Sequence, residues 1–218
     1  MDVQHPNNVL ASLPSNDFEL LRPHLKPFEL VHEDLLFDAG ETVKWIYFPH
    51  SGVISLVVGL ADGQMIETAM VGRDSLVSAS SAMDGRVSLN RGIVQVAGKA
   101  TILDVETLRG LAEQSIGFRT ILVRHEQALF AQAQQSAACN ASHSVEARLA
   151  RWLLRTRDLT GSDTLELTQG KCSACGGPAS RSSPTRCRTP VTSATAAGAC
   201  RSPICRACRK RPASAMQR

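Results

Sequence analysis

Residues 116–157 read IGFRTILVRHEQALFAQAQQSAACNASHSVEARLARWLLRTR, and this stretch decides how the chain is organised. From Ile116 to Ala137 the apolar residues follow helical spacing on two stripes. One stripe contains Phe118, Leu122, Leu129 and Ala133, and the other contains Val123, Phe130 and Ala137. Two stripes predict two packing partners, the preceding part of the chain and a second subunit. We expect the dimer helix to use Phe118, Leu122, Leu129, Phe130 and Ala133; the alternative is a helix buried within one monomer.

A second helix is predicted directly downstream. Residues 140–143, Asn-Ala-Ser-His, break the first pattern and supply capping side chains. The next residues place an apolar face opposite an arginine face, with Val145, Leu149, Trp152 and Leu153 against Arg148, Arg151 and Arg155. Residues 160–163 end this helix, and residues 165–168 read as a short strand, after which we expect no regular structure.

The preceding half of the chain has a different pattern. Residues 9–25 show helical spacing, whereas residues 28–105 form short β-type runs divided by Gly-containing turns such as Ser51-Gly52 and Asp62-Gly63. Strands at this spacing without long helices between them are typical of an antiparallel sandwich or roll. The sequence therefore predicts an α+β fold, an antiparallel β-roll with flanking helices and a long C-terminal dimerisation helix.

Composition changes sharply at residue 170. All 20 acidic residues of the chain precede it, while 10 of the 24 Lys and Arg residues and six of the seven Cys residues follow it. Residues 170–218 also lack Leu, Phe, Tyr and Trp, so this basic segment has no side chains for a core of its own and is expected to be disordered. Cys172, Cys175, Cys205 and Cys208 have the spacing of a four-cysteine zinc site, which is the alternative reading of the tail.

Several classes of protein are disfavoured by the same inspection. The chain has no apolar run long enough to span a membrane and no signal-peptide pattern at Met1, so we expect a cytoplasmic protein without membrane partners. It also has no nucleophile elbow, phosphate-cradling glycine loop or zinc-binding His-Glu-x-x-His helix. An enzymatic activity is therefore not expected.

Taken together, the N-terminal helix, the β-roll, the long helix and the Val145–Leu154 helix resemble the Crp/Fnr family of bacterial transcription regulators. The resemblance covers residues 9–169 and implies a cyclic-nucleotide-binding-like domain at 9–137, dimerisation through the long helix, and a DNA-binding domain that begins at 138–169. In that family a winged helix-turn-helix should follow Gln169. Here the basic tail at 170–218 follows instead.

The tail itself suggests a cause for this departure. A reading frame displaced by one base can encode, with permitted third bases, a recognition-helix-like run over residues 171–182 and a wing-like run over 187–198. We therefore hypothesise a frameshift near codon 170, so that no DNA-binding residue remains in frame. The nucleotide sequence of the locus tests this hypothesis.

The resemblance also implies a ligand site. The family binds ribose with a Gly-Glu pair and a cyclic phosphate with an Arg-Ser pair, on either side of a short helix. The matching residues are Gly72, Arg73, Asp74, Ser75, Asn90 and Arg91. Arg73 stands in place of the glutamate and Gly92 in place of the serine, so a cyclic nucleotide is not the expected cofactor. Another small anion, held by the two arginines, or no ligand at all are the alternatives.

From these observations we predict a homodimeric sensor and dimerisation module of a transcription regulator, without sequence-specific DNA binding in this chain. Two other functions stay open. One is a zinc-stabilised interaction protein that uses the cysteine-rich tail. The other is a decoy that forms inactive heterodimers with an intact paralogue.

Overall fold

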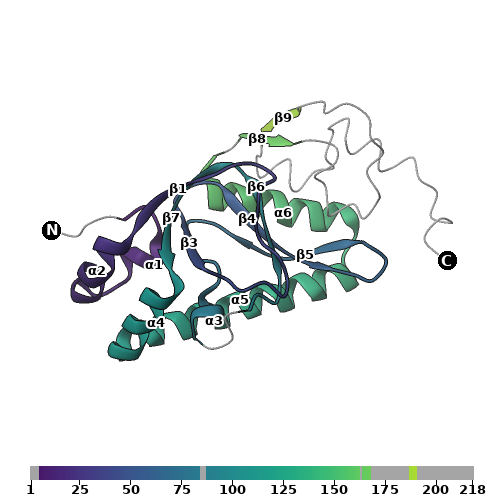
Figure 1. Ribbon diagram of the computed structural model, residues 1–218. Coiled ribbons are helices and arrows are strands. Elements are labelled where there is room, and N and C mark those ends of the chain that lie inside the picture. Colours follow the sequence, from purple (N-terminus) through teal and green to yellow (C-terminus); the bar gives the residue numbers. More distant parts are fainter. Residues whose placement is uncertain (1–4, 84–86, 163, 168–186, 191–218) are drawn as a thin grey trace. The chain divides into compact units, whose positions relative to one another are not determined.

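The computed structural model describes residues 5–83, 87–162, 164–167 and 187–190 (Figure 1). The helices are α1 (Asn8–Ala11), α2 (Ser15–Leu21), α3 (Ala79–Met83), α4 (Val105–Gln114), α5 (Ile116–Ser142) and α6 (Val145–Thr160), with a 3-10 turn at Arg22–His24. The strands are β1 (Lys26–Leu30), β2 (Leu35–Phe37), β3 (Trp45–Pro49), β4 (Val53–Gly59), β5 (Met65–Val71), β6 (Arg91–Val96), β7 (Gly98–Asp104), β8 (Thr164–Leu167) and β9 (Cys187–Pro190). The chain divides into two compact units, Met1–Ala138 and Cys139–Arg218.

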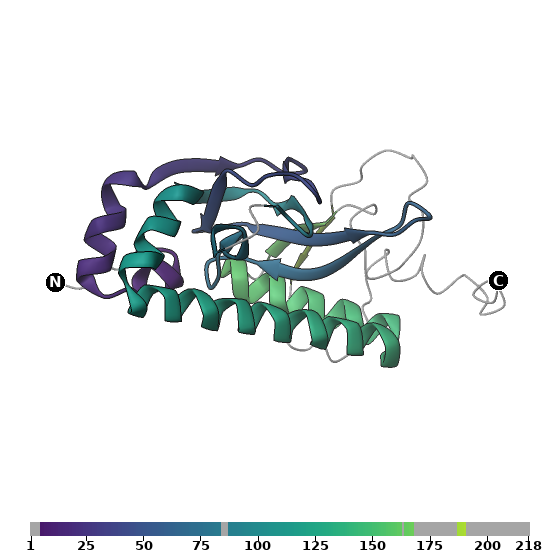
Figure 2. The same ribbon diagram turned by 60° about the horizontal axis from the view of Figure 1, so that its bottom comes forward.

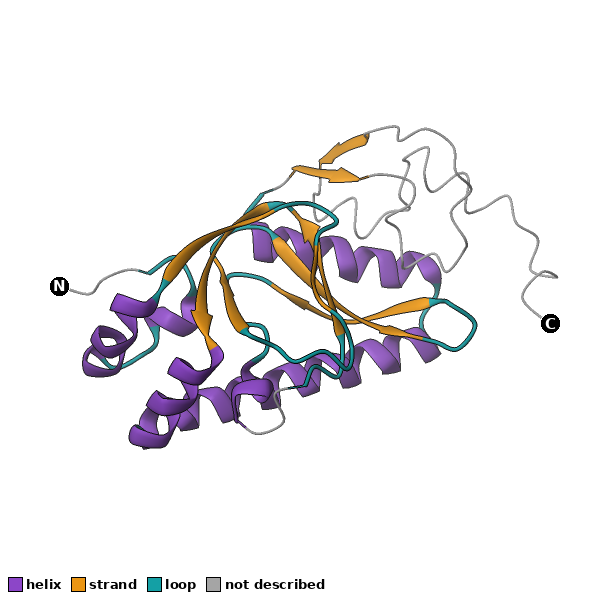
Figure 3. Ribbon diagram, viewed as in Figure 1, coloured by secondary structure: helices purple, strands orange, loops and turns teal. Residues whose placement is uncertain are grey.

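The first unit contains the predicted roll (Figure 3). Its strands form two antiparallel sheets, in the orders β1-β7-β3 and β2-β6-β4-β5. The predicted glycine turns make the corners. Gly52, for example, has φ +81, and a Cβ there would lie 2.5 Å from the Val96 carbonyl oxygen. Only glycine fits such a position, so the turn before β4 is fixed by the sequence.

Two apolar clusters fill this unit. The first joins the N-terminal helices and α4 to the start of α5, with Leu10, Leu21, Phe48, Leu108 and Phe118 among its buried residues. The second fills the roll itself, between the two sheets. Its largest members are aromatic or aliphatic, as the following set shows: Leu30, Phe37, Tyr47, Ile54, Leu56, Val94 and Ile102. The interior of the roll is thus a packed core.

The buried side chain of Asn7 ties the N-terminus to this body. Asn7 is 0% exposed and caps α1 by accepting the N–H groups of Val9 and Leu10. Its side-chain amide donates to the carbonyl oxygens of Pro49 and Ser75, at 2.9 and 2.8 Å. Every polar atom of this amide therefore has a use, which explains how an asparagine can be fully buried.

Helix α5 runs beneath the strands of the first unit (Figure 2), and its two stripes have separate roles. Phe118 and Leu122 are 1% and 0% exposed in the first cluster, and Leu129 packs against the second. This corrects the predicted dimer residues, because a side chain buried in its own subunit is not available to another. Of that set Phe130 is 65% exposed and Ala133 is half-buried. The helix also continues through Asn140 and Ala141, where the sequence predicts a break.

The second unit contains α6, which begins and ends as its sequence predicts. The Ser144 side chain accepts the Ala147 N–H at the start, and Gly161 ends the helix in the left-handed conformation with φ 66. On its apolar face Leu153 is buried, while Val145, Leu149 and Trp152 are half-buried.

The predicted short strand is present as β8, and it pairs with β9 in an antiparallel ladder from Thr164↔Pro190 to Leu167↔Cys187. A strand at 187–190 corrects the expectation that the whole tail is without regular structure. The four cysteines of the zinc alternative lie outside the described residues. Within the described part of the chain, the helices are too short or too polar to cross a membrane.

Candidate ligand site of the β-roll

The segment Gly72–Ser75 forms a turn directly after β5. The Ser75 N–H donates to the Gly72 carbonyl at 3.0 Å, and the Asn8 N–H donates to the Arg73 carbonyl at 2.7 Å. The side chains of Arg73 and Asp74 are exposed, whereas Gly72 and Ser75 are buried. The turn is therefore held through its backbone, and its charged side chains face outward.

Ser75 connects this turn to helix α5. Its hydroxyl oxygen lies 2.5 Å from Nε2 of His125, and the N–H of Leu76 donates to the same nitrogen at 3.1 Å. Both residues are 9% exposed. Ser75, predicted as a ligand contact, is thus occupied by a contact within the protein.

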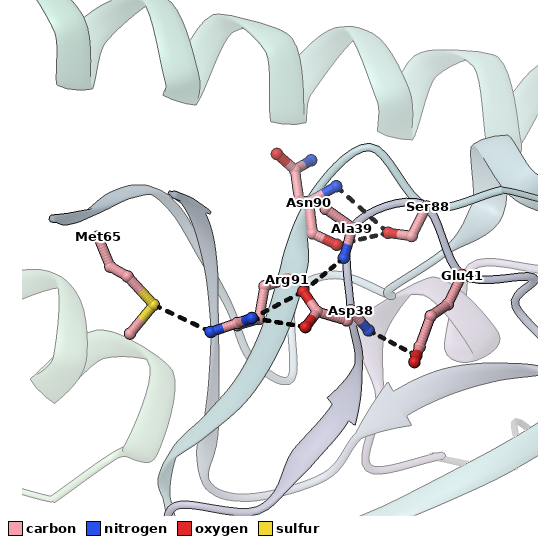
Figure 4. Close-up of polar contacts among 7 residues, drawn as sticks. All are labelled: Asp38, Ala39, Glu41, Met65, Ser88, Asn90 and Arg91. Carbon is pink, nitrogen blue, oxygen red and sulfur yellow. Dashed lines mark hydrogen bonds and ion pairs between the residues drawn. The ribbon is translucent and has the colours of Figure 1, made fainter. Parts of the chain in front are cut away.

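Arg91 is paired with a carboxylate of its own chain (Figure 4). At the start of β6, its Nε donates to Asp38 Oδ1 at 2.8 Å and its Nη2 to Asp38 Oδ2 at 2.5 Å. Its Nη1 points to the Met65 sulfur at 3.4 Å. The hydrogen bond from Arg91, followed by that from the Ala39 N–H, lowers the pKa of Asp38, and the same carboxylate raises the pKa of Arg91. A bidentate pair of this kind uses the two N–H groups with which an arginine would hold an anionic ligand.

The turn after β2 is joined to the segment before β6 by further hydrogen bonds. The Asp38 N–H donates to the Glu41 carboxylate at 2.9 Å, the Gly40 N–H donates to the Ser88 carbonyl at 2.8 Å, and the Ser88 N–H donates to the Glu41 carbonyl at 2.9 Å. The Ser88 hydroxyl donates to the Asn90 carbonyl at 2.6 Å. Asn90 therefore belongs to this internal network, which also positions Asp38 for Arg91.

The sheet register separates the two arginines that the sequence suggests as anion ligands. Arg91 lies opposite Val57 of β4, whereas Val71, which precedes Gly72 and Arg73, lies opposite Ile54. These two positions on β4 are roughly 10 Å apart at the usual rise of a strand. The backbone positions of Arg73 and Arg91 are therefore well separated on the sheet.

Gly92 has no room for a side chain. A Cβ at this position would lie 2.4 Å from the ring of Phe37, which is itself buried in the core of the roll. Gly92, which stands where the family resemblance implies a serine, is thus covered by an aromatic ring. Burial in the same core raises the pKa of Tyr47. This interior favours apolar groups over a charged ligand.

The short helix expected between the two halves of the ligand site is present as α3. It begins at Ala79, after Ser78, which has a left-handed φ of 76. The residues that adjoin the helix are thus Ser78 and Ala79, and Gly72 and Arg73 lie several residues before them. Sequence reasoning missed Phe37, Asp38 and His125, because each contacts a residue about 50 positions away and has no local motif.

Comparisons with known proteins identify the fold of this chain. No protein-family model and no curated protein matches the chain. A solved structure of the c-di-GMP-responsive global regulator CLP of Xanthomonas campestris is similar, with 13% identity, a TM-score of 0.60 and coverage of 74% of this chain and 84% of that one.

Two further solved structures are similar to this chain. A Crp/Fnr-family regulator of Eubacterium rectale has 14% identity and a TM-score of 0.60, covering 78% of this chain and 79% of its own. FixK2 of Bradyrhizobium japonicum has 13% identity and a TM-score of 0.58, covering 69% of this chain and 76% of its own. The chain therefore has the fold of Crp/Fnr-type regulators, with a cyclic-nucleotide-binding-like β-roll and a long helix behind it.

Proposed function

We propose that this chain is the sensing and dimerising part of a Crp/Fnr-type transcription regulator. The observation that carries the proposal is the outward face of α5. The inward face of this helix packs on the roll, yet Ile116, Val123 and Phe130 remain 80%, 43% and 65% exposed. An exposed apolar row along a long helix favours a partner that covers it.

The spacing of this row favours a second copy of the same helix. Ile116, Val123, Phe130 and Ala137 repeat every seven residues, which is the period of a coiled coil. Between them lie Thr120, Gln127 and Gln134, at alternating steps of three and four. One seam position thus holds apolar residues, among them the β-branched Ile116 and Val123, and the other holds polar residues. The partner in this proposal is therefore a second copy of α5, in a symmetric homodimer.

Cyclic AMP is not the signal in this proposal. Arg91 is engaged by Asp38, the ring of Phe37 covers Gly92, and Arg73 stands where a ribose-binding carboxylate is required. Isothermal titration of the full chain with cyclic AMP should give no binding heat. The titration overturns this part of the proposal if it shows saturable binding that Arg91→Ala abolishes.

We do not expect sequence-specific DNA binding of this chain. The family resemblance implies a winged helix-turn-helix after Gln169, and the basic segment 170–218 stands at that place. The ten tail cations favour salt-sensitive attraction to any nucleic acid through counterion release. A gel-shift series with a candidate promoter and unrelated DNA should give equal binding that weakens steeply with salt. Specific binding that survives competition and higher salt contradicts the proposal.

The oligomeric state is tested separately. Light scattering on the purified full chain should give the mass of a dimer, and a monomer at high protein concentration contradicts the proposed interface. Co-purification with an intact paralogue distinguishes the decoy function, since a homodimer alone does not require one. Zinc stoichiometry of the purified chain tests the interaction-protein alternative.

A further inference from the structure

The imidazole of His125 occupies a buried position between α5 and the segment that leads into α3. Because the N–H of Leu76 donates to Nε2 at 3.1 Å, this nitrogen carries no proton. The nearby Ser75 hydroxyl, at 2.5 Å, then also acts as a donor to Nε2. This arrangement therefore requires the tautomer whose proton is on Nδ1.

The opposite side of the ring is incompletely satisfied. Nδ1 is buried and has no hydrogen-bond partner among the described residues. Oε1 of Glu126, the next residue of the helix, lies 3.8 Å from Nδ1, beyond hydrogen-bond distance. That same oxygen accepts the N–H of Ser80 at 3.1 Å. Two consecutive residues of α5 thus hold the segment at two points, His125 at Ser75 and Leu76, and Glu126 at Ser80.

We propose that His125 is an acid-sensitive latch, which holds residues 75–80 against α5 while its imidazole is neutral and releases them when it is protonated. Protonation places an N–H on Nε2 opposite the N–H of Leu76, so that this backbone bond is lost and only the Ser75 hydroxyl, which can rotate to accept, still bonds to the nitrogen. A buried imidazolium also needs a counter-charge. This inference does not depend on the proposed regulatory function.

The charged groups around the ring strengthen this conclusion. On the facing segment, the side chains of Arg73 and Asp74 are exposed, and each takes part in a polar or electrostatic interaction. On its own helix, Arg124 is exposed, whereas Glu126 is half-buried. Glu126 can pair with the imidazolium only by moving toward Nδ1, and this movement gives up the Ser80 N–H. Either response to protonation therefore removes a bond between α5 and the segment.

Ser78 has two unfavourable features that release of the segment would relieve. This residue adopts a left-handed φ of 76, which is unfavourable for a residue other than glycine, and its hydroxyl is buried without a hydrogen-bond partner among the described residues. Both features are maintained only while the neighbouring residues are held in place. Opening of the latch allows Ser78 to relax and α3 to shift with it.

The test compares the full-length protein with His125→Gln. The side-chain oxygen of glutamine reaches the position of Nε2 and accepts the Leu76 N–H, but it does not titrate. Amide hydrogen exchange, corrected for its intrinsic pH dependence, is measured at about pH 8 and about pH 5, the range in which histidine changes charge. We expect protection of Leu76 and Ser80 to fall at least tenfold at the lower pH in the wild type and to stay constant in His125→Gln. His24→Gln, at an exposed histidine, is the control and should behave as the wild type.

Equal losses in the wild type and in His125→Gln, or no loss in the wild type, overturn the proposal. A second measurement covers a variant that does not fold. The ¹⁵N shifts of the His125 ring in the wild type should indicate an unprotonated Nε2 at high pH, which becomes protonated in step with the loss of Leu76 protection. A ring that stays neutral while that protection is lost also overturns the latch.

Discussion

The two faces of α5 carry similar apolar residues but differ in burial. Phe118 and Leu122 on the inward face are buried in the core of their own unit, while Val123 and Phe130 on the outward face stay exposed. Apolar content alone does not distinguish these faces, because each offers large side chains at helical spacing. The inward face also carries polar groups that reach the roll, namely His125 and Gln132. A face with polar groups that match particular backbone sites belongs to the fold, and a face without them is left for a partner.

The largest expected effect is on the inward face. Phe118→Ala should lower the free energy of unfolding by about 3–5 kcal/mol, because it leaves a cavity at a fully buried position. Denaturant unfolding measures this loss. Leu20→Ala, at a residue 57% exposed, is the control and should stay within about 0.5 kcal/mol. A Phe118 variant of normal stability that no longer dimerises would instead return this residue to the interface.

On the outward face, Phe130→Ala should weaken dimerisation by roughly 2 kcal/mol, or about 30-fold, as expected for an aromatic side chain at the centre of an interface. Monomer stability should stay within about 0.5 kcal/mol, since the ring covers little of its own subunit. Sedimentation equilibrium measures the dissociation constant. Leu89→Ala removes an equally apolar side chain that is 86% exposed, outside the stripe, and should leave the dimer intact. If both variants weaken dimerisation equally, the exposed face of α5 is not the dimer interface.

A smaller effect is expected from the polar contact of the inward face with β5. The Gln132 side-chain oxygen accepts the N–H of Met70 at 2.6 Å. Gln132→Ala should cost about 1 kcal/mol, because it leaves this N–H without its acceptor. Gln132→Glu keeps an oxygen at that position and should preserve protection of the Met70 amide in hydrogen exchange. Loss of protection in both variants would mean that the helix holds the strand by packing alone.

The smallest expected effect is the contribution of two histidines outside α5 to the pH dependence of stability. This contribution must be distinguished from that of His125. The rings of His5 and His50 are 5.2 Å apart. Burial lowers the pKa of both, and the proximity of His5 lowers that of His50 further. A lowered pKa in the folded state means that their contribution to stability is complete above about pH 6.5 and is lost as the pH falls through the lower folded values. His50→Gln should flatten this part of the curve of thermal midpoint against pH; an unchanged curve would remove the pair from the acid response.

Local signals were sufficient for most of the architecture. The turn at Gly52, the strand runs before and after it, and the caps at Ser144 and Gly161 each follow from a few neighbouring residues. The sequence predicts a helix break at 140–143, whereas α5 continues to Ser142. Capping residues such as Asn140 also occur within helices. The four residues of β9 were missed, since their composition resembles that of the surrounding tail.

The candidate site depended on contacts that are distant in sequence. The sequence suggests Arg91 as an anion ligand. In the structure its guanidinium is paired with Asp38, which lies 53 positions earlier in the chain. Ser75 likewise looked available until His125, 50 positions later, reached its hydroxyl. A motif reports which residues are present, but the partners that satisfy them come from the tertiary structure.

The contact between Phe37 and Gly92 restricts the order in which the roll can evolve. A mutation that places any side chain at position 92 meets the aromatic ring first, and is selected against as a folding defect. A smaller residue at position 37 must come earlier, although alone it leaves a cavity in the core. Introduction of a polar group at position 92 thus requires a less stable intermediate, and descendants of this sequence are expected to keep the two residues as a pair.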